Sequence, residues 1–107
     1  MKIGIVISTN EPEVAWNALR FGVTALASNH EVKVFLINKG VELEDIENEK
    51  YDVKKQVGSF IENKGQIMAC GTCLKSRQNG GSNVCPISTM KDLLELVEES
   101  DKVLTFC

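Results

Sequence analysis

The chain has 107 residues and a net charge of −3, with 43% hydrophobic and 25% charged residues. These values indicate one globular domain, residues 1–107, with enough apolar side chains to bury a core. Because no basic block is present, a surface that tracks the phosphates of a nucleic acid is not expected. The apolar stretch Ile3–Ile7 is too short for a signal-peptide core, and nothing approaches the length of a membrane span. We therefore expect a cytoplasmic protein.

The first half of the chain predicts two strands around a long helix. Lys2–Ser8 is a continuous apolar run, which is typical of a central parallel strand with both faces buried. Val32–Ile37 predicts a second strand, because it is again apolar and rich in β-forming residues. Asn10 and Glu13 form a capping signature for the helix between these strands. The apolar residues at helical spacing in this segment are Val14, Ala15, Ala18, Leu19, Phe21, Gly22, Ala25 and Leu26. Glu42–Lys50 holds five acidic residues and is expected to be a solvated loop, with room for a frayed helical turn.

The second half continues the alternation of helices and strands. An apolar stripe at helical spacing runs through Val53–Ile61, before a third strand at Gln66–Cys70 and a short helix at Leu74–Arg77. Val84–Ile87 predicts a fourth strand, at an edge or irregular, because Pro86 cannot donate a hydrogen bond to a neighbour. The remaining elements are a helix capped by Thr89, with an apolar face of Met90, Leu93, Leu94 and Val97, and a closing strand at Val103–Phe106.

This order predicts an α/β protein in which a five-stranded parallel sheet lies between two helix layers, a three-layer α/β/α sandwich. In such a sheet all strands end along one edge, which is where α/β proteins place their ligand chemistry. The residues expected at this edge are Ser8, Asn38, Cys70, Ser88 and Cys107.

Cys70 is the residue most clearly placed for chemistry, within the motif Cys70-Gly71-Thr72-Cys73. It ends a strand and begins a helix, where free amide groups stabilise an anion such as a thiolate. Gly71 permits a tight transition and should leave the sulfur open to a partner. Cys73 lies on the same helical face, roughly 5 Å away between Cα atoms, and could resolve a persulfide or sulfenic acid on Cys70. Alternatively, both are small core residues.

The other candidate residues are less clearly placed. Cys85 sits in an apolar segment and is expected to be a buried filler, whereas Cys107 is the last residue, either mobile and reactive or inert. Arg77 either faces the thiolate as an anion partner or projects into solvent. His30 is the only histidine and is expected at the opposite edge of the sheet, which disfavours a Cys–His hydrolase.

The stretch Ala69–Arg77, with Ile87–Leu93 opening the last helix, resembles the DsrE/DsrF-like sulfur-relay proteins, which include the TusD-type subunits of tRNA thiolation. The resemblance covers nearly the whole chain in the order and length of elements. Its sequence-specific part is one cysteine at this strand exit and an arginine seven residues later. Cys73 is not required by the family pattern.

The resemblance implies a carrier without a cofactor that holds sulfur as a persulfide on Cys70. Its partners would be other sulfur-relay proteins as donor and acceptor, and it would assemble as an oligomer, often a trimer or hexamer. The family's strand order places the fourth strand beside the third and the fifth at the far side. Cys107 would then lie three strand spacings, roughly 14 Å, from Cys70.

Four other interpretations remain open at this stage. A thioredoxin-like oxidoreductase fits the Cys-x-x-Cys motif but not the order of elements. The four cysteines could form a tetrahedral metal or iron–sulfur site, although only Cys70 and Cys73 are close in sequence. Ser8-Thr9-Asn10 is a faint match to the phosphate loop of a flavodoxin-like domain, but a helix cap explains it. A non-catalytic assembly subunit would be marked by a Cys70 that is buried in an interface and alkylates slowly.

Overall fold

The computed structural model describes residues 1–107, and its strands and helices alternate as the sequence predicts. The strands are β1 (Lys2–Ile7), β2 (Glu31–Leu36), β3 (Gln66–Cys70), β4 (Ile87–Ser88) and β5 (Lys102–Phe106). The helices are α1 (Pro12–Ala27), the 3₁₀ helix η1 (Asn38–Asp45), α2 (Val53–Glu62), α3 (Gly71–Ser76) and α4 (Met90–Glu99).

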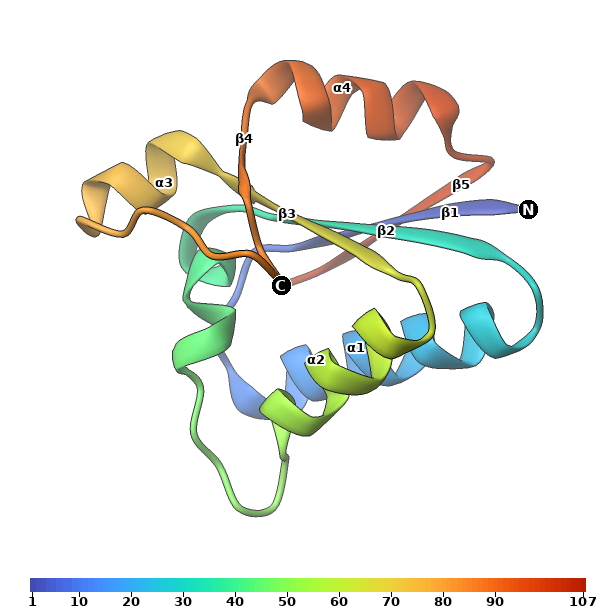
Figure 1. Cartoon of the computed structure of the whole chain (residues 1–107), viewed down its shortest axis with the longest axis horizontal. Coiled ribbons are helices and arrows are strands. Elements are labelled where there is room, and N and C mark those ends of the chain that lie inside the picture. The colour runs from blue at the N-terminus through green and yellow to red at the C-terminus, as the bar shows by residue number, and fades with distance from the viewer.

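All five strands join in one parallel sheet with the order β4-β3-β2-β1-β5. The predicted α/β class and five-stranded parallel sheet are therefore confirmed, as is the strand order that the family resemblance implied. Helices α1 and α2 cover one face of the sheet, and α4 lies across the other (Figure 1). Because all pairs are parallel, the ends of β1, β2, β3 and β4 meet at one edge, with η1 and α3 beyond it.

The two helix layers approach the core differently. On one side, Phe60 of α2 is fully buried, and a Cβ at Gly22 of α1 would lie 2.8 Å from its ring, so the glycine lets the two helices pack closely. On the other side, α4 crosses β1 at Gly4, where a Cβ would collide with the Leu96 side chain. Leu96 is the only fully buried residue of α4. None of the helices has the length and apolar character needed to cross a bilayer.

Three predicted local features of the first half are wrong. The cap of α1 is Glu11 instead of Asn10, because Pro12 takes the first helical position, where its missing N–H costs nothing. The Glu11 carboxylate accepts the N–H of Val14 at 2.8 Å. The segment expected to be a solvated loop includes the end of η1, whose Leu43 is fully buried. Phe21 of α1 is exposed instead of core-facing, although the small residues of the predicted stripe are buried.

Two predictions in the second half are also corrected. The fourth strand is Ile87–Ser88 instead of Val84–Ile87, because Pro86 lacks an N–H and joins the sheet only through its carbonyl, which accepts the Ala69 N–H at 3.0 Å. The predicted inner face of α4 is largely its outer face: Met90, Leu94 and Val97 are exposed, Leu93 is half-buried and Leu96 points inward. The capping box of α4, Thr89 with Asp92, forms as expected of a helix start.

Candidate functional site

Cys70 lies where the sequence places it, as the last residue of β3 and the cap residue of α3. Its register partner across the sheet is Ser88 of β4. The expectation of an open sulfur is wrong, because Cys70 is only 3% exposed and belongs to the apolar core. Gly71 explains part of this burial: a Cβ there would lie 3.1 Å from Ile87 Cγ2 and 3.2 Å from the Ser88 carbonyl. The glycine admits β4 close to α3 instead of opening a path to the sulfur.

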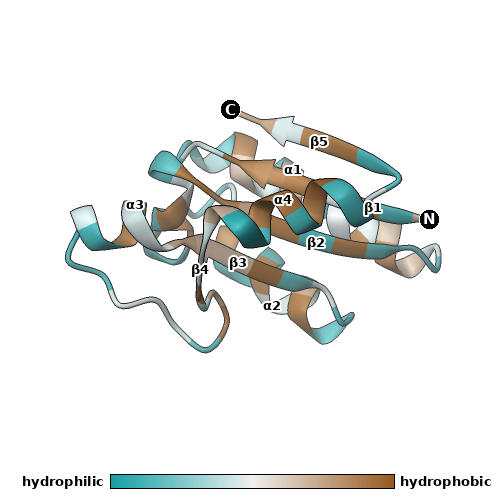
Figure 2. Cartoon of the chain, turned by 90° about the horizontal axis from the view of Figure 1, so that it is seen from above, coloured by the Kyte–Doolittle hydropathy of each residue, from teal (hydrophilic) through white to brown (hydrophobic).

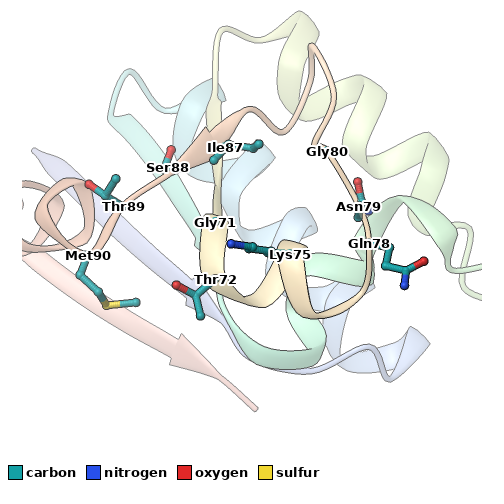
Figure 3. A pocket seen from close by; sticks show the side chains of 10 residues that line it. All are labelled: Gly71, Thr72, Lys75, Gln78, Asn79, Gly80, Ile87, Ser88, Thr89 and Met90. Carbon is teal, nitrogen blue, oxygen red and sulfur yellow. The ribbon is translucent and has the colours of Figure 1, made fainter.

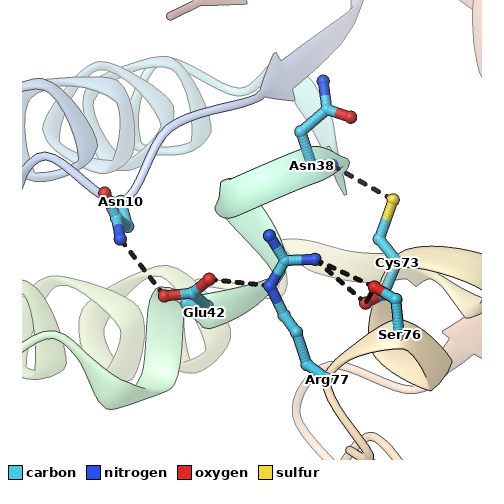
Figure 4. Close-up of polar contacts among 6 residues, drawn as sticks. All are labelled: Asn10, Asn38, Glu42, Cys73, Ser76 and Arg77. Atoms are coloured by element: carbon cyan, nitrogen blue, oxygen red, sulfur yellow. Dashed lines mark hydrogen bonds and ion pairs between the residues drawn. The ribbon is translucent and has the colours of Figure 1, made fainter.

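Cys73 is the half-buried sulfur of the pair, one helical turn beyond Cys70. Its Sγ accepts a hydrogen bond from the backbone N–H of Asn38 at 3.3 Å (Figure 4). Asn38 opens η1 with a φ of +54°, a left-handed conformation that few residues other than glycine and asparagine adopt. The turn out of β2 therefore presents a main-chain donor to the second cysteine of the motif.

Burial raises the pKa of the Cys73 thiol, and its hydrogen bond to the neighbouring Cys70 sulfur raises it further. The Asn38 N–H and the Arg77 charge lower the pKa, but they do not outweigh the first two causes. With its pKa raised above the ordinary value, the Cys73 thiol stays protonated at neutral pH.

Arg77 does not contact either sulfur, and its exposed side chain is held by partners on η1 and α3 instead of projecting free into solvent. Its Nε donates to the Glu42 carboxylate at 2.7 Å, and one of its terminal nitrogens donates to the Cys73 carbonyl at 3.1 Å (Figure 4). The Arg77 hydrogen bond lowers the pKa of Glu42, and the amide of Asn10, 3.1 Å from the other carboxylate oxygen, lowers it further. Arg77 thus ties α3 to η1.

Glu42 and Asn10 are site residues that the sequence places elsewhere, Glu42 in a solvated acidic segment and Asn10 in a helix cap. Asn38 is expected at this edge, but the sequence gives it no role there. Glu42 and Asn38 follow β2 at the same sheet edge as Cys70. The rule that parallel strands end along one edge of the sheet places Asn38 near Cys70, as it does Ser88. Nothing local in the sequence, however, pairs Glu42 or Asn38 with α3.

The remaining cysteines are separate from this pair. Cys85 is buried, and its pKa is raised to about 12, first by burial and then by the charge of Glu44 and a hydrogen bond to it. Cys107 is exposed and follows β5, which is separated from β3 by β1 and β2. No three or more His, Cys, Asp or Glu side chains are grouped to hold a metal ion. The tetrahedral four-cysteine site is therefore not formed within this chain.

His30 lies at the opposite edge of the sheet from Cys70, as predicted. It precedes β2, and its Nδ1 is 2.7 Å from the amino group of Met1. A Cys–His dyad is therefore not formed at the Cys70 edge.

An open hollow of about 820 Å³ adjoins the start of α3. Its walls come from α3, the segment after it, and the β4–α4 junction (Figure 3). Gly71, Thr72 and Lys75 form one side, and Ile87 and Met90 are its two apolar residues. Cys70 immediately precedes Gly71 in the sequence but does not line the hollow. The hollow therefore borders the motif without reaching the buried sulfur.

Fold and site together define an α/β protein with a Cys-x-x-Cys motif at the carboxyl edge of a parallel sheet. The model of the DsrE/DsrF-like family matches residues 1–106, and the chain belongs to this family. The uncharacterized protein MJ0989 of Methanocaldococcus jannaschii is 35% identical, with 99% of this chain and 100% of that protein covered. The uncharacterized protein MK0008 of Methanopyrus kandleri is 37% identical, with 88% of this chain and 83% of that protein covered.

A solved structure shares the fold. It is the conserved protein of unknown function BT1422 from Bacteroides thetaiotaomicron, with a TM-score of 0.77 and 16% identity. The match covers 97% of this chain and 93% of that one. At this identity the likeness shows the fold alone. Family membership points to a role related to sulfur relay.

Proposed function

We propose that this protein is a cytoplasmic sulfur carrier that holds sulfur as a persulfide on Cys70 and passes it to a partner protein. The observation that carries the proposal is the placement of Cys70 at the start of α3, with the Cys73 thiol one turn away. The donor and the acceptor are other sulfur-relay proteins, no cofactor takes part, and the carrier is a homo-oligomer, a trimer or hexamer. These last features rest on the family resemblance.

The proposed chemistry is two sulfur transfers of the same kind. The Cys70 thiolate attacks the outer sulfur of a donor persulfide, so that a new S–S bond forms on Cys70 while the donor's S–S bond breaks and the donor leaves as a thiolate. An acceptor thiolate then attacks the outer sulfur on Cys70 in the same way. Each step makes one S–S bond and breaks one, so neither step needs an oxidant or a reductant.

In this scheme Cys73 stabilises the reacting sulfur. A thiol that stays protonated at neutral pH can donate its S–H to a thiolate or persulfide anion on Cys70. The amide at the start of α3, that of Gly71, supplies a further partial positive charge. Arg77 contributes by holding α3 in place through Glu42. If Cys73 instead attacked the inner sulfur, a Cys70–Cys73 disulfide would form and hydrosulfide would leave.

The test is intact mass after incubation with a persulfide donor. We expect a gain of one sulfur atom that dithiothreitol removes and that Cys70→Ser abolishes. The matched control is Cys107→Ser, which removes an exposed thiol three strands away and should load like the wild type. Cys73→Ser should still load but hold its sulfur for a different time. A gain that persists in Cys70→Ser would place the acceptor elsewhere.

A non-catalytic assembly subunit is the second candidate, and the 3% exposure of Cys70 favours it. A reagent reaches this sulfur only when α3 moves away from β4 or η1. The rate of Cys70 alkylation in the native protein, compared with that in the unfolded protein, distinguishes the two functions. A native Cys70 that resists alkylation for as long as the fold persists, together with no gain of sulfur, would favour the assembly subunit.

A further inference from the structure

The outer side of α4 carries an apolar row without a partner in the chain. Ile87, Met90, Leu94 and Val97 are 57%, 53%, 55% and 48% exposed. Their spacing of three and four residues places Met90, Leu94 and Val97 on one side of the helix, and Ile87 in β4 leads into it. Figure 2 shows α4 from its outer side, where short bands of apolar and polar residues alternate along the helix. An exposed apolar row of this kind is a candidate surface for binding another molecule.

The charges beside this row favour one occupant. Lys91 and Glu98 lie seven residues apart, two helical turns, on the solvent side of the apolar row. Both are exposed, and neither forms an ion pair within the chain. In an antiparallel pair of α4 helices centred near Leu94, Lys91 of each copy faces Glu98 of the other. A parallel two-fold pair would instead set each Lys91 and Glu98 on the opposite flank from its copy, so that neither Lys91–Glu98 contact would form.

We propose that α4 is a two-fold interface in which a second copy of this chain packs antiparallel against the row Ile87, Met90, Leu94 and Val97. The interface is isologous, so each Lys91–Glu98 contact occurs twice. The apolar row supplies most of the affinity, and the two ion pairs fix the direction of the helices. This inference does not depend on sulfur transfer.

The interface would also complete the wall of the hollow beside the cysteine motif. Ile87 and Met90 belong both to the apolar row and to the lining of that hollow. In an antiparallel pair, the Met90 end of one α4 meets the Glu98 end of the other. The second copy therefore stands at the rim of the hollow that begins at Gly71.

The test is the oligomeric state of the full chain by sedimentation velocity and light scattering over a range of concentrations. We expect Leu94→Glu to weaken self-association at least tenfold, as for the centre of an interface. If the wild type is a hexamer, Leu94→Glu should reduce it to a trimer. The matched control is Phe21→Glu, which places the same charge at an exposed apolar residue of α1, on the other face of the sheet, and should change nothing.

Charge reversals keep the proposal falsifiable if Leu94→Glu fails to fold. Lys91→Glu and Glu98→Lys should each weaken association several-fold, because each turns two attractions into two repulsions. The double variant should recover the wild-type affinity to within about twofold. A wild type that is monomeric at all concentrations, or an oligomer that Leu94→Glu leaves intact, would overturn the interface. A double variant no better than the single ones would overturn the antiparallel arrangement. Sulfur loading, measured separately, reports on the proposed function alone.

Discussion

Access to Cys70 should depend on the attachment of α3 to η1, and Glu42→Gln tests this dependence. The sulfur is 3% exposed, so reagents reach it only when α3 moves. Two contacts hold this six-residue helix to η1: the Arg77–Glu42 ion pair at 2.7 Å and the Asn38–Cys73 hydrogen bond at 3.3 Å. Glu42→Gln keeps the size of the side chain and removes its charge, so of these two contacts it weakens only the first.

The expected effect is small, because water screens the pair. The side chains of Arg77 and Glu42 are 31% and 35% exposed. Pairs of this exposure contribute about 0.2–1 kcal/mol, so the open fraction, and with it the alkylation rate of Cys70, should rise about 1.4- to 5-fold. The assay is pulsed alkylation of the native protein, with Cys70 followed by peptide mass.

Glu47→Gln is the matched control, because it breaks the exposed Lys54–Glu47 pair, which does not involve α3. It should leave the rate unchanged. An unchanged or slower rate in Glu42→Gln, or an equal acceleration in both variants, would refute the idea that this ion pair restrains α3.

Three predictions concern stability. Thr89→Ala removes the capping box with Asp92 and should lower the free energy of unfolding by about 0.5–2 kcal/mol in urea titrations. Gly4→Ala places a Cβ against Leu96 and 2.8 Å from Ser100 Oγ, and should cost about 1–3 kcal/mol in the same assay; a neutral effect would contradict the packing of α4 on β1. The folded state raises the pKa of Cys85 from 9.0 to about 12, so its contribution to stability is present below pH 9.0 and is lost as the pH rises toward 12. Cys85→Ala should flatten that loss, as followed by thermal unfolding across this range.

The parallel sheet could be predicted from the sequence because each strand has a local residue pattern that identifies it. The run that became β1 is apolar without alternation, as expected of a strand with both faces buried, and β2 is rich in apolar, β-forming residues on either side of Lys33. Cys70 could be placed at the carboxyl edge of the sheet for the same reason, since the end of a strand is a local signal.

The contacts around Cys70 could not be predicted, because they join residues far apart in the chain. Glu42 and Arg77 are 35 residues apart, and so are Asn38 and Cys73. In the sequence, Glu42 stands in an acidic run and looks like part of a solvated surface. The burial of Cys70 depends on how closely β4 approaches Gly71, which is a property of tertiary packing.

The orientation of α4 was mispredicted for a related reason. The apolar spacing of Met90, Leu94 and Val97 correctly indicated an amphipathic helix, but periodicity does not say which partner the apolar side meets. Gly4 leaves room for Leu96, so that side of the helix turns toward the sheet and the wider apolar row faces outward.

The most direct test of the account locates the transferred sulfur within the motif. After loading from a persulfide donor and alkylation, trypsin should release Gly65–Lys75, which holds both Cys70 and Cys73, separately from the peptides of Cys85 and Cys107. Fragment spectra of Gly65–Lys75 should place the extra sulfur on Cys70. Extra sulfur on another cysteine, or none on any of the four, would contradict the proposal that Cys70 carries it.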